Sequence, residues 1–411
     1  MSSDEEKRQN PQEPPNGGAR AWGVALGALA AQMYVHLRLY QHIRGLPKLL
    51  QYNLSLLRIL QQHLMDRLPA SLPPLPLRCR QRSLSDRLGV KAVVIPAGLT
   101  LVFSVMMTSL SHEYYQFILA QGVLGGMACG MIFTPVVSCV GQYFTTRRAW
   151  AMGVVVSGAA IGGIVFPITL NRLLNHHHLS FGWSVRVIGF IMLALLIYAA
   201  LVTKEFAPRR QKNMFLSSAF KKWPYNLTNA GFLLALLGLY APIFYIADYA
   251  VERGGMSKQM ALYQVAILNA PSFFGRTIPN FAGDKLGRFN ITIFTYAACA
   301  ILLFCWTAAT SSAAIMVWIA FFGFFSGAVF SLYSPTVAQV CPDPSDIGTY
   351  VGQGLAICSF GALAGTPING ALIRTYGYLE ASMFSAAMVT AGLICQVIAR
   401  LLLDKKPWTV V

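Results

Sequence analysis

One arginine stands inside a long apolar run of this sequence. The run is "AILNAPSFFGRTIPNFAG", residues 266–283, and Arg276 is its one charged residue. An ionisable side chain within a membrane span is costly to bury, so it usually faces a cavity or a partner. A guanidinium can hold a carboxylate through two parallel charge-assisted hydrogen bonds. Arg276 is therefore our candidate for binding an anion, with a structural arginine bonded to backbone carbonyls as the alternative.

Neighbouring side chains could complete such a site. Asn269 and Phe273 lie seven and three residues before Arg276, so a helix would carry all three on one face. The preceding apolar run holds Tyr240 and Tyr245, whose hydroxyls could form hydrogen bonds to a ligand. A plain packing face and interfacial tyrosines would leave the same pattern, so both interpretations stay open.

A carboxylate near the end of that earlier run could carry a proton. It is Asp248, in "APIFYIADYAVERGG". The end of a span lies close by, so a solvated or capping aspartate is the simpler interpretation. We keep Asp248 as the proton-coupling candidate.

Two short loops carry acids and bases together, in "SDRLG" from residue 85 and "GDKLGRF" from residue 283. Each loop joins two apolar runs. Ion pairs there could hold one end of a helix bundle shut and release it on rearrangement, and a tight-turn cap is the alternative. The residues with this candidate gating role are Asp86, Arg87, Asp284, Lys285, Arg288, Arg147 and Arg148.

No other pattern predicts chemistry. Consecutive histidines at 176–178 cannot all face one ion from a helix, and no cysteine or acid cluster accompanies them. The eight cysteines are scattered, and the sequence has no P-loop, no G-x-G-x-x-G after a strand and no Ser/His/Asp set. We expect no metal, no cofactor and no enzymatic activity.

The elements that must position these residues are membrane spans. The 411 residues are 55% hydrophobic and 11% charged, against roughly 25% charged in soluble domains. The net charge of +17 comes from Lys and Arg between the apolar runs, and no nucleic-acid-reading module is visible. We predict an all-α polytopic membrane protein, with a lipid bilayer and a small organic solute as partners and no nucleic acid. The ten clear spans are about 90–110, 116–138, 150–171, 184–203, 230–250, 261–282, 290–310, 314–339, 350–372 and 380–403.

The basic residues also predict the orientation. If the ten spans alternate and the basic loop 204–226 is cytoplasmic, fourteen Lys and Arg lie on the cytoplasmic side against five on the other. The positive-inside rule then places both termini in the cytoplasm. We expect a multi-pass protein of the plasma membrane, with the vacuolar membrane as the alternative.

An internal repeat divides the chain. Asp86 and Asp284 stand 198 residues apart in similar loops, and Pro167 and Pro367 stand 200 apart in Gly-rich runs. Such duplicated halves are typical of secondary transporters, whose solute site lies between them. The predicted parts are a disordered tail 1–20, a first half 21–203, a basic loop 204–226, a second half 227–404 and a tail 405–411.

The Asp-Arg-x-Gly loop at 86–89, with its counterpart at 284–287, resembles the signature loop of the major facilitator superfamily. Longer stretches resemble the fungal branch of its monocarboxylate porter family. These are "PNGGARAW" at 15–22, "YYQFILAQGVLGGMACGMIFTP" at 114–135, "YFTTRRAWAMGVVVSGAAIGG" at 143–163, "ILNAPSFFGRTIPNFAGDKLGRFN" at 267–290 and "CPDPSDIGT" at 341–349. Asn16 departs from the aspartate usual in fungal members.

The resemblance implies two six-helix halves, twelve spans and alternating access. It further implies a small organic acid or related metabolite as solute, often moved with a proton. In that family an arginine at the position of Arg276 binds the substrate carboxylate. Animal members carry an acid one turn earlier, where this chain has Ser272, so the resemblance does not support a carboxylate–arginine proton switch here.

Residues 34–82 do not fit this plan. They hold eight Lys and Arg and one acid where the end of a first span and a whole second span are expected. Each arginine at a bilayer centre costs about 2.5–3.5 kcal/mol, so no window there is expected to insert. Permitted codons for residues 33–80, read one nucleotide later, give a peptide with almost no charge that resembles the missing spans. We interpret the segment as a frame or splice error, with a surface-lying amphipathic insertion as the alternative.

Three classes of protein could account for these observations. A secondary transporter of a small organic solute fits the repeat and the resemblance. A transport-dead relic or binding-only membrane protein is the alternative, because the first two helices are not intact. A membrane enzyme or a seven-span receptor is disfavoured by ten spans, a half-repeat and no catalytic set.

Overall fold

The computed structural model describes residues 19–33, 90–144, 147–175, 179–202, 216–343 and 346–403. Several predictions concern residues outside these ranges. The residues concerned are most of the N-terminal tail, the segment 34–82, Asp86, Arg87, the greater part of the basic loop and the C-terminal tail. Within the described ranges every regular element is a helix.

The first half contains α2, α5 to α9 and one short π-helix, η4. Their bounds are α2 Ala19–Gln32, α5 Val90–Thr108, α6 Tyr114–Phe117, η4 Ile118–Gly125, α7 Gly126–Tyr143, α8 Arg148–Asn175 and α9 Phe181–Val202. The sequence predicted one uninterrupted span over 116–138, whereas α6, η4 and α7 share this stretch. The π turn is supported from outside, because the Ser104 hydroxyl of α5 donates a hydrogen bond to the Ala120 carbonyl at 2.7 Å.

The second half contains α10 to α15 with two 3₁₀ turns. Their bounds are η5 Ser217–Lys221, α10 Trp223–Glu252, α11 Lys258–Leu286, α12 Arg288–Phe304, η6 Trp306–Ala308, α13 Ser312–Val340, α14 Ile347–Thr375 and α15 Tyr378–Leu403. Local signals begin and end these helices. The Ser257 hydroxyl caps α11 by accepting from the Met260 amide at 3.2 Å, and Gly287, at φ +93°, separates α11 from α12.

Each of the ten predicted spans corresponds to helix. Within the described residues, eight helical stretches are long and apolar enough to cross a membrane. The other two are α11, which has 29 residues with several polar side chains, and α12, which has 17 residues. Helices extend beyond the predicted spans at most ends, because polar and aromatic interface residues continue the helix after the apolar run stops. The polytopic all-α architecture is confirmed.

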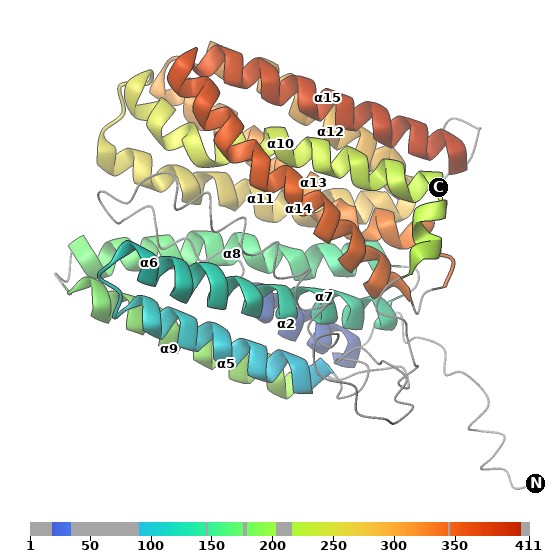
Figure 1. Ribbon diagram of the computed structural model, residues 1–411, viewed down its shortest axis with the longest axis horizontal. Coiled ribbons are helices and arrows are strands. Elements are labelled where there is room, and N and C mark those ends of the chain that lie inside the picture. Colours follow the sequence, from blue (N-terminus) through green and yellow to red (C-terminus); the bar gives the residue numbers. More distant parts are fainter. Residues whose placement is uncertain are drawn as a thin grey trace, which may run out of the picture.

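The helices form two bundles that lie side by side with their axes roughly aligned (Figure 1). In one bundle α5 packs against α7 and α9, and α2 packs against α8 and α9. In the other α10 packs against α14 and α15, and α11 and α12 pack against α13. The main contact between the bundles is that of α8 with α11.

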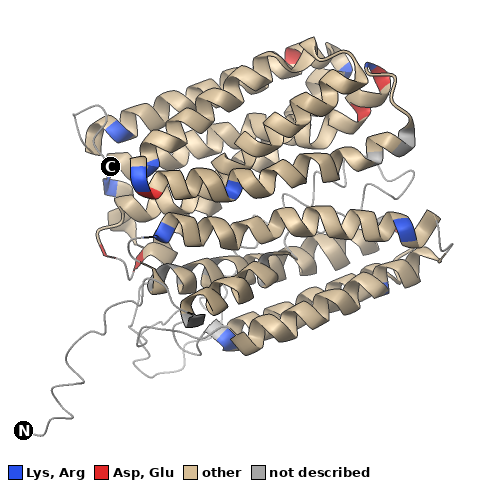
Figure 2. Cartoon of the chain, turned by 180° about the vertical axis from the view of Figure 1, so that it is seen from behind, with Lys and Arg blue, Asp and Glu red and all other residues tan. Residues whose placement is uncertain are grey.

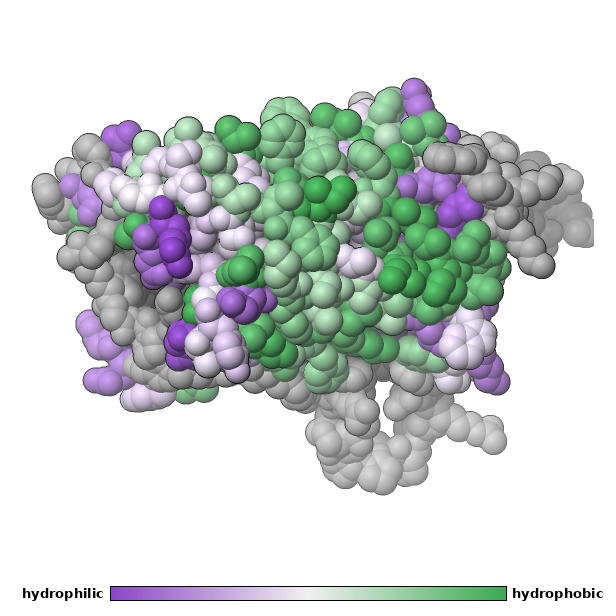
Figure 3. All heavy atoms as spheres, turned by 90° about the horizontal axis from the view of Figure 1, so that it is seen from above, coloured by the Kyte–Doolittle hydropathy of each residue, from purple (hydrophilic) through white to green (hydrophobic). Residues whose placement is uncertain are grey.

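Charge and hydropathy follow the helix axes. Figure 2 shows Lys, Arg, Asp and Glu gathered towards the two ends of the helices, with few in the middle. On the face in Figure 3, apolar residues fill the middle of the surface and hydrophilic ones lie towards both ends. This is the distribution that a bilayer requires.

Glycines let several helices approach closely. A Cβ at Gly158 of α8 would collide with the backbone of Leu29 in α2, and one at Gly162 with that of Met33, the residue after α2. On α14, a Cβ at Gly361 would likewise collide with the Leu233 carbonyl of α10. Glycines four residues apart on α8 therefore allow close contact between helices.

Candidate functional site

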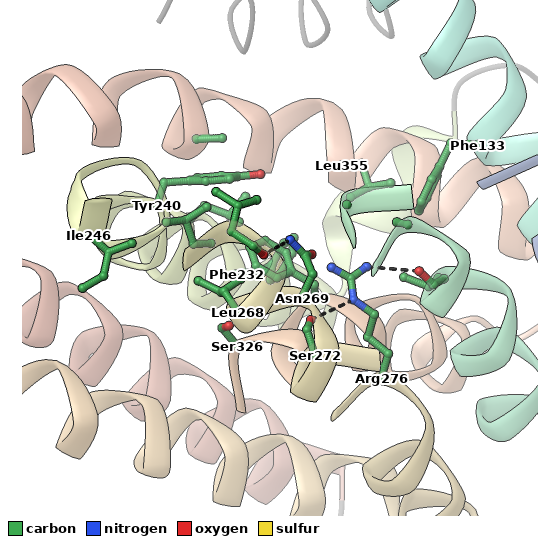
Figure 4. Close-up of a pocket in the computed structure, with 18 of the residues that line it drawn as sticks. Phe133, Phe232, Tyr240, Ile246, Leu268, Asn269, Ser272, Arg276, Ser326 and Leu355 are labelled. Carbon is green, nitrogen blue, oxygen red and sulfur yellow. Dashed lines mark hydrogen bonds between the residues drawn. The ribbon is translucent and has the colours of Figure 1, made fainter. Parts of the chain in front are cut away.

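A cavity of about 220 Å³ lies between the two bundles. Helices α7 and α8 of the first half and α10, α11, α13 and α14 of the second half form its wall, part of which is drawn in Figure 4. The lining residues are Phe133, Val156, Ala159, Gly163, Pro167, Phe232, Leu236, Tyr240, Ile243, Ile246, Val265, Leu268, Asn269, Ser272, Arg276, Ser326, Phe330, Leu355, Ser359 and Ala362. Most are apolar, as in ligand pockets generally.

Arg276 is part of this wall. Its side chain is 5% exposed, and two of its hydrogen bonds reach neutral acceptors. The Nε group donates to the Ser272 hydroxyl at 3.3 Å, and Nη1 donates to the Val156 carbonyl of α8 at 3.1 Å (Figure 4). The second bond crosses between the halves. Arg276 thus combines the two interpretations given above, since it bonds a backbone carbonyl and also lines a cavity.

Close packing of α8 on α11 holds the arginine in place. A Cβ at Gly153 of α8 would collide with the Arg276 carbonyl oxygen. A Cβ at Gly163 would lie 2.7 Å from Cγ of Asn269. Two glycines ten residues apart on α8 therefore allow the polar face of α11 to lie against the first half.

Asn269 and Tyr240 also line the cavity. The Asn269 amide donates to the Val265 carbonyl one turn earlier, at 2.7 Å. The Tyr240 ring lies 5.7 Å from the ring centroids of both Phe244 and Phe330. Figure 4 shows Tyr240 towards the end of the cavity away from Arg276.

Three predicted residues lie elsewhere. Phe273 is absent from the cavity wall and packs edge-to-face on Phe274, with centroids 5.3 Å apart. The Tyr245 hydroxyl donates to the Thr366 carbonyl of α14 at 3.2 Å. Asp248 lies one turn before the end of α10 and outside the wall. Phe273 is turned away because the wall follows α11 through Asn269, Ser272 and Arg276, and residue 273 is rotated about 100° from residue 272 around the helix axis.

Several lining residues were not predicted. Ser272 lies one turn before Arg276, and this spacing in the sequence could have indicated it. Ser326 and Ser359 stand among small residues of α13 and α14 and look like ordinary packing positions. Phe133 and Phe330 come from other helices, and nothing local in the sequence brings them to the site.

Asp284 connects the halves at one end of the bundle. Its carboxylate accepts from the Ala149 and Trp150 amides, the second and third residues of α8, at 3.1 and 2.9 Å. It also pairs with Arg288 at 3.1 Å. A carboxylate at a helix N-terminus satisfies free N–H groups and is stabilised by the helix dipole.

The other predicted gate residues surround this contact or lie outside it. Arg148 donates from Nε to the Phe144 carbonyl at 3.1 Å. The Lys285 ammonium lies 4.5 Å from the Phe281 ring centroid, and Arg147 is exposed. Asp86 and Arg87 are outside the described residues. Among described residues no group of His, Cys, Asp and Glu could hold a metal.

Two helical bundles share a cavity, and Asp284 joins them at one end. This is the architecture of a polytopic membrane transporter. The model of the Major Facilitator Superfamily matches residues 83–366. The chain belongs to the major facilitator superfamily.

Similar fungal proteins support this assignment. An aspyridones efflux protein of Emericella nidulans is 39% identical over 385 residues, which cover 92% of this chain and 77% of that one. An agnestins efflux protein of Paecilomyces divaricatus is 38% identical over 322 residues, covering 77% of this chain and 73% of that one.

Solved structures agree on the fold. A human organic anion transporter superposes with a TM-score of 0.71 at 14% identity, covering 94% of this chain and all of that one. The Escherichia coli fucose:proton symporter gives a TM-score of 0.69 at 14% identity, covering 92% and 98%. At such identities the likeness shows the fold alone.

Proposed function

We propose that this transporter moves a small organic anion, a monocarboxylate or related metabolite, by alternating access. The observation that carries the proposal is Arg276, a buried cation on the wall of a cavity shared by both halves. A guanidinium matches a carboxylate in shape as well as charge. The resemblance to the fungal monocarboxylate porters supports the same solute class, and the relatives named as efflux proteins favour export.

Arg276 also suggests how binding couples to the movement of the halves. It belongs to the second half and bonds Val156 of the first. A solute carboxylate on the guanidinium would compete with that carbonyl and weaken one contact between the halves. The Asp284 contact to α8 would then act as the gate, made in one state and broken in the other.

Transport in proteoliposomes tests the proposal. We expect Arg276→Gln to weaken uptake of the labelled solute about tenfold to a hundredfold, since a charge-assisted hydrogen bond contributes about 1.5–3 kcal/mol. Arg276→Lys should recover part of it, because the charge remains without the planar fork.

Arg400 is the matched control. It is also 5% exposed and bonds a neutral acceptor, the Asn290 side chain, away from the cavity. Arg400→Gln should leave transport per folded protein unchanged. Equal losses in both variants would mean that Arg276 acts only in folding.

Proton coupling is a separate part of the proposal, with Asp248 as the carrier. We expect Asp248→Asn to abolish uptake driven by a pH gradient while exchange of labelled for unlabelled solute continues. Wild-type uptake that ignores the pH gradient would exclude coupling.

A further inference from the structure

We propose that the cavity is a two-part site for an amphiphilic monoanion, with the acid held at Arg276 and an apolar arm lying towards Ile246. This inference rests on the proposed function, because it takes the cavity to be the solute site. It goes further in naming the shape of the solute and the residues that select it.

The two ends of the cavity differ in chemistry. Figure 4 shows Arg276 at one end, beside Phe133 and Leu355, and Ile246 at the other, with Tyr240 nearby. Arg276 is the one charged side chain among the described residues of the wall. A second acidic group would therefore be buried without a cation in this wall, which is costly. The wall suits one negative charge.

Three other polar side chains of the wall donate hydrogen bonds within their own helices. The Ser326 hydroxyl donates to the Gly323 carbonyl at 3.4 Å, and the Ser359 hydroxyl donates to the Ala356 carbonyl. The Asn269 amide donates to Val265. Because these donors already have acceptors, the wall away from Arg276 presents mainly hydrocarbon to a ligand, with the Tyr240 hydroxyl as its polar exception.

That hydrocarbon is continuous over two helices. Ile243 and Ile246 of α10 face the cavity together with Val265 and Leu268 of α11. All four are buried, between 2% and 8% exposed. An apolar arm that lies against these side chains would be removed from water, and each methylene buried in this way strengthens binding about fourfold.

The length of the wall separates this solute from the smallest acids. Along α11 the lining residues run from Val265 to Arg276, eleven residues or about 16 Å at 1.5 Å per residue. An extended chain advances about 3.5 Å for every three bonds, so about fourteen bonds would span that distance. A two-carbon acid would occupy only the end beside Arg276.

Binding of a homologous series to the purified full-length chain tests the inference. The probes are unbranched carboxylates from acetate to dodecanoate, with octanamide and octanedioate as uncharged and doubly charged counterparts of octanoate, and their binding is measured by titration calorimetry. We expect affinity to rise about fourfold per methylene between butanoate and octanoate. Octanamide and octanedioate should each bind at least tenfold more weakly than octanoate.

Variants identify the apolar end. Ile246→Ala should weaken the binding of dodecanoate about tenfold or more and leave that of butanoate within about twofold, because only the longer acid reaches that residue. Ile243→Ala provides a second variant of the same end, should the first fail to fold. Leu234→Ala is the control, since Leu234 lies on α10 outside the wall. Leu234→Ala should change the affinity for neither acid.

The outcomes separate this inference from the proposed function. Affinities that depend on Arg276 but not on chain length would leave the organic-anion function standing and refute the apolar arm. Octanamide binding as well as octanoate would refute the anionic end. If no carboxylate binds and none is transported, the function and the inference fail together.

Discussion

Replacing Asp284 by asparagine should loosen the contact between the halves where α8 begins. The carboxylate accepts from two α8 amides and from Arg288. Asp284→Asn keeps the size of the side chain and removes its charge. One of the two acceptor oxygens becomes an NH₂ group, which finds only further donors at a helix N-terminus.

The expected magnitude follows from these contacts. Loss of a capping side chain costs about 1 kcal/mol, and loss of a negative charge at a helix N-terminus costs about 0.3–1 kcal/mol more. The Asp284 side chain is 8% exposed, so solvent screens it little. A total of about 1–2 kcal/mol changes the ratio of separated to closed halves about five- to thirtyfold.

Distances between spin labels can measure this change. Arg147 and Leu286 flank the contact on opposite halves, and both are exposed. Cysteines at these two positions would carry the labels. In Asp284→Asn we expect the population at longer distances to grow at least fivefold over the parent.

The neighbouring lysine supplies the control. Lys285 lies over Phe281 of its own helix, so Lys285→Gln should leave the distances unchanged. A distribution in Asp284→Asn that superimposes on the parent would refute the reasoning, as would an equal change in Lys285→Gln.

Three further predictions concern packing, reactivity and the gene. Gly158→Val would collide with the Leu29 carbonyl and should destabilise the protein by about 1–3 kcal/mol in a thermal unfolding assay, whereas Gly23→Ala, with its nearest atom at 3.6 Å, should be neutral. Burial raises the pKa of Cys341, in the loop after α13, to about 11. Because the thiolate is the reactive form, its alkylation should rise about tenfold per pH unit between pH 8 and 10, and a plateau below pH 9 would contradict this pKa. Sequencing the mature transcript across codons 30–90 should reveal the shifted reading frame. Finding the frame that encodes the present residues 34–82 would instead support a transport-dead relic.

The positions of the helices could be predicted because lipid imposes a local requirement. About 20 apolar residues are needed wherever a helix crosses, whatever its neighbours. Arg276 stood out for the same reason, as a charge within such a run. The π turn η4 could not be predicted, since its support comes from Ser104 on another helix.

Membership of the site was decided by tertiary structure. On α11 the sequence pointed to Phe273, whereas the rotation of α11, packed on Gly153 and Gly163 of α8, turns Ser272 to the cavity. The Tyr245 hydroxyl likewise donates to the Thr366 carbonyl because α14 lies beside α10.

The sequence by itself determined that this protein is a bundle of membrane helices in two related halves, because hydropathy, basic loops and repeat spacing are properties of the chain. Only the tertiary structure decided which side chains meet in the cavity and that Asp284 caps α8. Those contacts join residues more than 100 positions apart, and they depend on how each helix is rotated against its neighbours.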